Sequence, residues 1–315
     1  MSSPSIFPVE LYNAIIDVSD FDMLGTYRLV CQAWLRSSQY RYFRQVRIDD
    51  SNIQAFVDSL SSPMCRIAPL IHKLEILFQF DPSNLGEYPD AGRLNGLANL
   101  PIFVSLTSLR LRAMKWAHIS VDIQAVFRPF REVVELEIDD VYFDDVSQLV
   151  EMFCAFPSLQ SLTLQGGVGY RDTDVMTPSL RRANVLTRLK TIKITNSWCP
   201  EILTLISLCL PKPALETLHL STLFLPSMPF FGEFVTPSAP FLKEVKFLTT
   251  NFGHDAEAIL GVFGTMSSPP FLSTISFNLQ MFTVVTSHYT FLPSCARLNF
   301  LSTSSDMTAR LPSAY

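Results

Sequence analysis

The sequence predicts a mixed α/β protein in which an N-terminal helical domain precedes a curved parallel sheet that carries helices on its convex side. A six-residue pattern, apolar-x-x-apolar-x-apolar, recurs along the chain at intervals of 23 to 35 residues. The segments between its copies are long enough for a turn and a short helix. Such a period is typical of solenoids, whose units bury their apolar faces only against their neighbours. The first 42 residues lack the pattern and show helical periodicity instead.

The copies of the pattern predict about ten strands. In LETLHL at 215–220, Leu218 and Leu220 are one residue apart, so both point to the same side of a strand, which we expect to be the interior. The last apolar residue of each copy, its anchor, is Ile48, Ile76, Leu111, Ile138, Leu164, Ile194, Leu220, Phe247, Phe277 or Phe300. The residue before each anchor should face solvent on the concave side. From the second copy on, these residues are Glu75, Arg110, Glu137, Thr163, Lys193, His219, Lys246, Ser276 and Asn299, and all are polar.

Apolar residues at helical spacing predict helices between the strands. In the segment 145–153, Val146, Leu149, Val150 and Phe153 form one stripe at i, i+3, i+4 and i+7. Comparable segments lie at 121–127, 201–210 and 256–264. The longest apolar stretch, at 202–210, is too short to cross a bilayer, so we expect no membrane partner.

The repeats resemble degenerate leucine-rich repeats of the longer kind found in intracellular proteins. The resemblance implies a solenoid over residues 43–302 and a C-terminal tail at 303–315. That family usually has Asn or Cys three residues after the anchor, where the side chain bonds to the backbone of the turn. Here those positions hold Gln79, Met114, Val141, Gly167, Ser197, Leu223, Thr250, Gln280 and Thr303, which leaves the turn geometry open.

Composition indicates an intracellular protein that does not bind nucleic acid. The apolar fraction is 48% and the net charge is −5, so a core is possible and a basic footprint for nucleic acid is lacking. The six cysteines show no CxxC spacing and are interpreted as small buried residues in a reducing compartment. The opening MSSPSIFPVE lacks the basic start and long apolar run of a secretory leader. We expect a cytoplasmic or nuclear location, or both.

The N-terminal segment predicts two or three helices that must pack on something, because so short a unit holds little core by itself. One apolar stripe comprises Leu11, Ala14, Ile15 and Val18, and a second comprises Tyr27, Val30, Cys31 and Trp34.

Residues 6–46 resemble the F-box, in which a Pro-x-Glu-Leu opening is followed by Val-Cys-x-x-Trp. The matching segments are FPVEL at 7–11 and VCQAW at 30–34, and the run into the first strand is similar to that of F-box/leucine-rich-repeat proteins. This sequence departs from the pattern at Phe7, where Leu is usual, and at Val18-Ser19, where an Ile/Tyr-Leu pair often stands.

The resemblance implies a substrate-recognition subunit of a cullin-type, SCF-like ubiquitin ligase. In that family the F-box docks on a Skp-type adaptor, and through it on a cullin, while the repeats hold a client protein. The adaptor-binding residues that it implies are Pro8, Leu11, Ile15, Ile16, Leu24, Leu29, Val30 and Trp34. Alternatively, Trp34, Leu11 and Ile15 pack the helical unit against the first repeat. The corresponding alternative function is a non-ligase repeat scaffold or inhibitor that binds a partner through its concave face alone.

The concave face has one charged feature. Basic Arg110 and Arg112 lie on one expected strand, and acidic Glu135, Glu137 and Asp139 lie on the next. Two interpretations stay open: cross-strand ion pairing between neighbouring repeats, or a bipolar patch that selects a charged segment of a client. The candidate client-binding residues are Arg110, Arg112, Glu135, Glu137, Asp139, Lys193 and His219.

We expect no enzymatic activity, catalytic residue, metal or cofactor. The five histidines fall in different repeats, with no spacing that builds a metal site. The one glycine cluster, at 166–169, lacks the Gly-Lys-Ser/Thr ending of a phosphate-binding loop and predicts a flexible connection. No Gly-x-Ser-x-Gly nucleophile motif is present.

Overall fold

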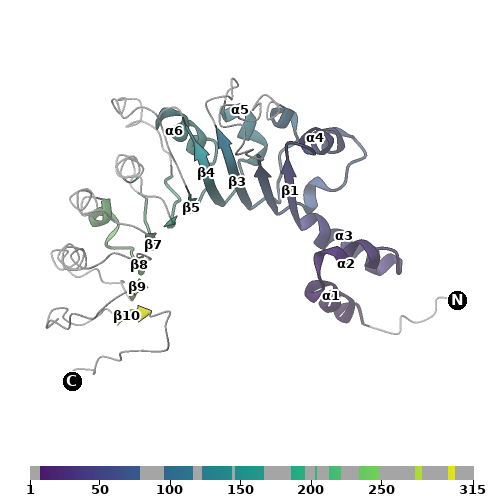
Figure 1. The fold of residues 1–315 in the computed structure, drawn as a ribbon, viewed down its shortest axis with the longest axis horizontal. Helices are drawn as coiled ribbons and strands as arrows, with labels where there is room; N and C mark the ends of the chain where they lie inside the picture. The colour runs from purple at the N-terminus through teal and green to yellow at the C-terminus, as the bar shows by residue number, and fades with distance from the viewer. Residues whose placement is uncertain are drawn as a thin grey trace, which may run out of the picture.

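The computed structural model consists of three N-terminal helices followed by one parallel sheet (Figure 1). It describes residues 8–78, 96–115, 123–143, 146–166, 186–195, 203, 213–220, 234–247, 274–278 and 297–301. The sheet has ten strands in chain order, so each strand pairs with its neighbours in sequence. In Figure 1 the strands follow an arc, and the helices α4, α5 and α6 lie on its outer side. The mixed α/β class with a parallel sheet is therefore confirmed.

Every predicted anchor lies in a strand, and the anchors are aligned across the sheet. Ile48 pairs with Ile76, Ile76 with Leu111, and the alignment continues without a slip to Phe277 and Phe300. The strands are β1 Gln45–Asp49, β2 Lys73–Leu77, β3 Ser108–Lys115, β4 Glu135–Tyr142, β5 Ser161–Gln165, β6 Thr191–Thr195, β7 Thr217–Leu220, β8 Glu244–Phe247, β9 Thr274–Asn278 and β10 Arg297–Leu301.

Burial explains why this register is fixed. In β5, Leu162 and Leu164 are fully buried while Thr163 between them is partly exposed, and β6 to β8 alternate in the same way. One contiguous apolar core runs from Ile48 in β1 to Phe247 in β8. A slip by one residue would move each strand's apolar residues out of this core, so the alternation strongly specifies the pairing.

A left-handed residue ends the regular part of three successive strands. Ala113, Asp140 and Gly166 each lie two positions after the anchor and have φ of 51°, 53° and 64°. In β3 and β4 this residue shifts the alternation by one place, so that Met114 and Val141 pair with each other and are buried. Apolar packing therefore occupies the positions where the Asn or Cys of the repeat pattern would bond to backbone.

The helices between the strands are short. They are α4 Ile53–Ser61, α5 Ile123–Phe127 and α6 Val146–Cys154, with the 3-10 turns η1 Ala68–Leu70, η4 Arg128–Phe130 and η7 Thr236–Ser238. The helices predicted at 121–127 and 145–153 are confirmed. The segment 201–210 is described only at Leu203, which is buried, and 256–264 lies outside the described residues.

The N-terminal unit contains α1 Val9–Val18, α2 Phe21–Tyr27 and α3 Gln32–Arg44, as predicted in number. The expectation of one helical stripe from Tyr27 to Trp34 is wrong. The chain turns after Tyr27, and Cys31 is extended with φ −161° and ψ 170°, a conformation that cannot continue a helix. Trp34 therefore belongs to α3, while Val30 lies in the turn before it.

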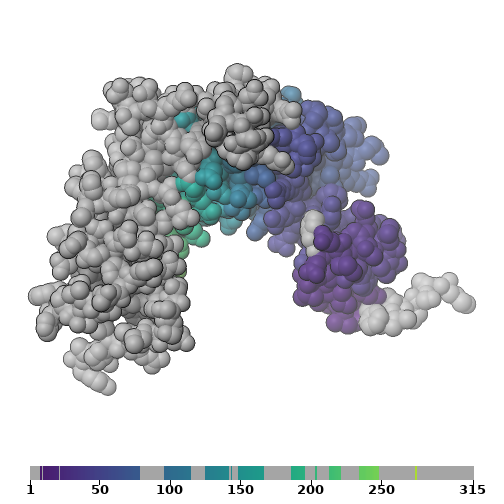
Figure 2. Space-filling view, in the orientation of Figure 1, coloured from purple at the N-terminus to yellow at the C-terminus, as the bar shows by residue number. Residues whose placement is uncertain are grey.

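The last helix of the unit connects directly to the sheet. α3 ends at Arg44 and β1 begins at Gln45, with no residue between them. The carbonyl of Arg44 accepts a hydrogen bond of 3.0 Å from the backbone N–H of His72. The ring of Tyr40 packs edge-on against the ring of His72, with centroids 5.8 Å apart. These contacts attach the helical unit to the first two strands, and Figure 2 shows the unit, in purple, at one end of the molecule.

The described cysteines are only partly as expected. Cys65 and Cys154 are partly buried and pack against the core, and burial raises the pKa of the Cys154 thiol. Cys31 is exposed, because it caps α3 instead of lying on a helical stripe. The other three cysteines lie outside the described residues. Among the described helices, none is both long and apolar enough to cross a membrane.

The alternation in β5 can be tested with two adjacent substitutions. Leu164→Asp should lower the free energy of unfolding by several kcal/mol, because it places an unpaired charge in the core. Thr163→Asp should change it by less than about 1 kcal/mol, because that side chain faces solvent beside Lys193. Denaturant unfolding of the two variants measures the difference, and equal losses would contradict the register.

The left-handed conformation predicts that exchanging Gly for Ala destabilises the protein and that exchanging Ala for Gly stabilises it. A Cβ at Gly166 would lie 2.1 Å from Asp140 Oδ1, so Gly166→Ala should destabilise the protein by more than about 1 kcal/mol. Ala113→Gly relieves the positive φ of an alanine and should stabilise it by up to about 1 kcal/mol. Thermal unfolding of both variants measures the sign of each change in stability. If Ala113→Gly destabilised the protein as much as Gly166→Ala, the two turns would not share one backbone conformation.

Candidate protein-binding surfaces

The core of the helical unit uses some of the residues expected to bind the adaptor. Ile16 of α1 and Leu24 of α2 are each 1% exposed and do not belong to the core of the sheet. They therefore form the interior of the unit and are not available to a partner. A three-helix unit needs its own apolar contacts, and these two residues supply them.

Trp34 holds the three helices together. Its ring packs edge-on against Tyr27 of α2, with centroids 5.0 Å apart, and lies 5.8 Å from the ring of Tyr12 of α1. Its side chain is partly buried. These partners lie within the unit, so the alternative that Trp34 packs against the first repeat is not supported by its ring contacts.

The remaining expected residues lie at the surface. Pro8, Leu11, Ile15, Leu29 and Val30 are all exposed, Leu29 by 81% and Val30 by 60%. Half of the exposed large apolar side chains in the described part of the chain fall between Leu11 and Val30. Scattered exposed apolar residues are ordinary, but a concentration on so small a unit indicates an interaction surface.

The basic and acidic residues of β2 to β4 form one ion-pair network. Arg112 Nε lies 2.8 Å from Asp139 Oδ2, and Arg112 Nη1 lies 3.3 Å from Glu75 Oε1. Arg110 Nη2 lies 3.0 Å from Glu137 Oε1 and 3.1 Å from Asp139 Oδ2. The parallel register places these residues on adjacent strands.

This network shows the cross-strand pairing of the first interpretation, while client selection by the same residues stays a prediction. Both arginines are engaged by carboxylates. Desolvation is the largest single effect on the pKa of Arg112 and lowers it, but the combined effects of Glu75 and Asp139 outweigh it, so the pKa is raised. Cross-strand pairing thus accounts for Arg110, Arg112, Glu137 and Asp139. Glu135 is exposed and is not one of the carboxylates that pair with Arg110 or Arg112.

The other two candidate client residues lie on β6 and β7. Lys193 pairs in register with His219, and His219 with Lys246 of β8. His219 Nε2 lies 3.5 Å from Glu244 Oε2, and Glu244 Oε1 lies 2.6 Å from Lys246 Nζ. The hydrogen bond from Lys246 is the largest of the effects that lower the pKa of Glu244.

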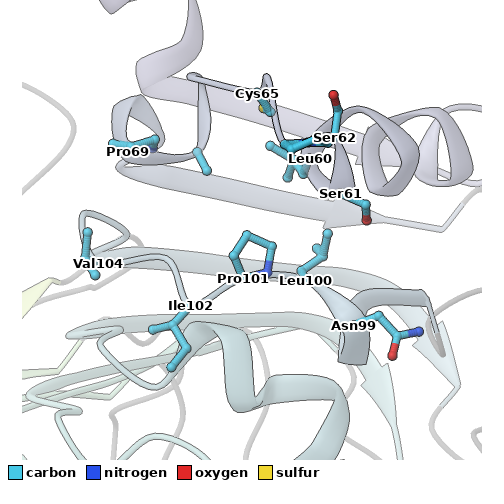
Figure 3. A pocket seen from close by; sticks show the side chains of 12 residues that line it. Leu60, Ser61, Ser62, Cys65, Pro69, Asn99, Leu100, Pro101, Ile102 and Val104 are labelled. Atoms are coloured by element: carbon cyan, nitrogen blue, oxygen red, sulfur yellow. The ribbon is translucent and has the colours of Figure 1, made fainter.

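A shallow groove that the sequence did not indicate is lined by residues that precede β2 and β3 in the chain (Figure 3). Its volume is about 560 Å³, and its walls are the end of α4, the segment 61–69 and the segment 99–104. Leu60, Leu100 and Pro101 project toward each other from opposite walls in Figure 3. Its residues come from two distant segments, so no local pattern could reveal it. Among the described residues, no cluster of three or more potential ligands could hold a metal.

Comparison with known proteins adds no identification. No protein-family model matches the chain, and no curated protein matches its sequence.

The ion-pair network should contribute to stability as a unit. Arg112→Met keeps much of the side-chain volume but leaves the largely buried carboxylates of Glu75 and Asp139 with only Arg110. We expect a loss of about 1–3 kcal/mol in the free energy of unfolding. The control Lys73→Met removes a positive charge from an exposed position of the same sheet and should cost less than about 0.5 kcal/mol. Equal effects of the two substitutions in urea unfolding would show that the network is energetically neutral.

Proposed function

We propose that this protein is a substrate receptor of a cullin-type ubiquitin ligase. The helical unit α1–α3 is an F-box that docks on a Skp-type adaptor, and the sheet is a degenerate leucine-rich-repeat solenoid that holds a client protein. The supporting observation is the concentration of exposed apolar side chains on a helical unit fixed to the end of a long parallel sheet. The protein itself performs no chemistry in this proposal.

The direct connection of α3 to β1 fits such a role. A receptor must hold its client at a defined place relative to the adaptor, and a flexible linker would not do so. Here the adaptor-facing unit and the first strand share a continuous backbone, braced by Tyr40 on His72. The arc of strands in Figure 1 then carries the client surface away from the unit in a fixed direction.

The alternative, a scaffold without adaptor contact, has one observation in its favour. Ile16, Leu24 and Trp34 pack within the unit, so three of the eight expected adaptor residues serve the fold of the unit. A scaffold and a receptor would present the same sheet. Only binding to a Skp-type adaptor distinguishes them.

The exposed turn before α3 offers a clean test of adaptor binding. Val30→Asp should reduce affinity for a purified Skp-type adaptor by about 30-fold or more, because it charges an apolar anchor without touching the core of the unit. Val104→Asp is the control, since Val104 is 73% exposed but lies on the sheet side of the molecule. Trp34→Ala is unsuitable, because it would also remove the aromatic packing that joins the helices.

Isothermal titration calorimetry of the full chain with the adaptor measures the three affinities. Thermal unfolding should be unchanged in both variants. Failure of the wild-type chain to bind any Skp-type adaptor would eliminate the receptor function and leave the scaffold.

A further inference from the structure

Strands β6, β7 and β8 present a row of basic residues on the solvent side of the sheet. Lys193, His219 and Lys246 occupy the same register position on three adjacent strands. Adjacent strands lie about 4.8 Å apart, so the row spans about 10 Å. The residues on either side of each, such as Ile192 and Ile194, are buried. The three side chains therefore point away from the core together.

The carboxylates near this row are already paired with lysines. Glu244 contacts Lys246, and at the edge of the strands Glu216 lies 2.5 Å from Lys243 Nζ and 3.5 Å from Lys190 Nζ. Lys193 forms no ion pair with any described residue; in register it lies between Thr163 and His219. Lysines thus outnumber glutamates on these strands, and Lys193 retains an uncompensated charge, in a chain whose net charge is −5.

His219 lies between Lys193 and Lys246, at the centre of the row. Its pKa is lowered, first by burial and then by the positive charge of Lys246, with a further contribution from Lys193. Glu244 acts in the opposite direction but does not reverse the shift. These lysines from β6 and β8, together with Glu244, are the charged groups that act on the imidazole. The two lysines disfavour a further cation between them, and an anion bound at the centre of the row would be attracted by both.

Hydroxyl groups flank the basic row. Thr191 and Thr217 pair in register two positions before Lys193 and His219, and Thr163 adjoins Lys193 on β5. All three are partly exposed. A hydroxyl can donate a hydrogen bond to a carboxylate oxygen, so the surface combines long-range attraction with short-range donors.

The first half of the sheet has the opposite character. In the network of β2 to β4, Arg110 and Arg112 face the three carboxylates of Glu75, Glu137 and Asp139, so negative charge is in excess. An acidic ligand would be repelled there and attracted to β6–β8. The charge of the sheet therefore fixes where along the arc such a ligand lies.

We propose that the face of β6–β8 binds an acidic peptide segment of the client, with Asp or Glu carboxylates at Lys193 and Lys246 and with His219 between them. The identity of this segment as a client depends on the proposed receptor function. The binding itself is a property of the sheet and needs no adaptor.

Fluorescence anisotropy with the full chain tests this directly. The probes are labelled synthetic peptides of alternating Glu and Ser, of Gln and Ser, of Lys and Ser, and of Gln and phosphoserine. The Glu peptide should bind at least about tenfold more tightly than the Gln peptide at low salt, and its affinity should fall as salt rises. Lys193→Gln should weaken the Glu peptide severalfold and Lys193→Glu by about tenfold or more. Lys73→Gln, which removes an exposed lysine from β2, should leave it unchanged.

Protonation of His219 gives a second readout. An anion stabilises the imidazolium, so the peptide should raise the pKa of His219 toward or above its ordinary value of about 6.5. Because the free protein has a lowered pKa, the Glu peptide should bind more tightly as pH falls through that range. The ring signals of His219 in an NMR titration measure the shift, and His219→Gln should remove the additional pH dependence.

Three results would overturn the proposal. They are equal binding of the Glu and Gln peptides, unchanged binding in Lys193→Glu, and preference for a phosphoserine peptide with no measurable binding of the Glu peptide. The last would assign the row to phosphoryl groups. Thermal unfolding of Lys193→Glu excludes a folding defect. If the adaptor did not bind in calorimetry, the ligase role would be eliminated but the peptide binding by β6–β8 would be unaffected. Failure of the proposed function and failure of the peptide-binding proposal are therefore distinguishable.

Discussion

The alignment of the anchors across ten parallel strands, buried from β1 to β8, is the constraint on which the rest of the molecule depends. Each strand from β2 to β8 contributes a pair of apolar residues to one core, and each pair packs on the pairs of the neighbouring strands. No unit can bury these residues alone, so the stability of each depends on its neighbours being in register. Once that register is fixed, the polar residues between the anchors are also aligned, and rows of like position cross the sheet. Both surface features of the sheet, the ion-pair network and the basic row, follow from this.

The left-handed residue after the anchor shows how the chain replaces a polar turn with an apolar one. An Asn at the third position would satisfy backbone groups through its side chain. Met114 and Val141 cannot do so, yet positive φ at Ala113 and Asp140 brings them inward, where they pair and extend the core. Gly166 repeats the conformation next to Asp140, in a space that admits no Cβ. The backbone conformation recurs in all three strands although the residue type changes.

The parts of the structure that could be predicted from sequence are those with a repeated local pattern. Strand positions were predictable because two buried residues separated by one polar residue form a local, period-2 signal, and its ten copies reinforce each other. The turn after the anchor was not predictable, because Ala113, Asp140 and Gly166 share no side-chain chemistry. In the helical unit, spacing identified an apolar stripe but not which residues face inward. Ile16 is buried and its neighbour Ile15 is exposed, a difference set by where α3 packs and not by residue type. The basic row was predictable, since Lys193, His219 and Lys246 each precede an anchor, whereas the pairing of Glu244 with Lys246 was not.

The same architecture makes the two proposed binding surfaces energetically separable. In a stack whose units contact only their neighbours, a substitution on β6 changes contacts with β5 and β7. It changes no contact with α1–α3. Effects of substitutions more than about 10 Å apart without shared partners are usually additive. The helical unit has its own small core around Ile16, Leu24 and Trp34, so charge changes on the sheet leave its packing intact. A receptor built this way can alter the surface that selects a client while keeping the surface that docks on an adaptor. In the proposed receptor, the continuous backbone from α3 into β1 would fix the direction in which a client is presented.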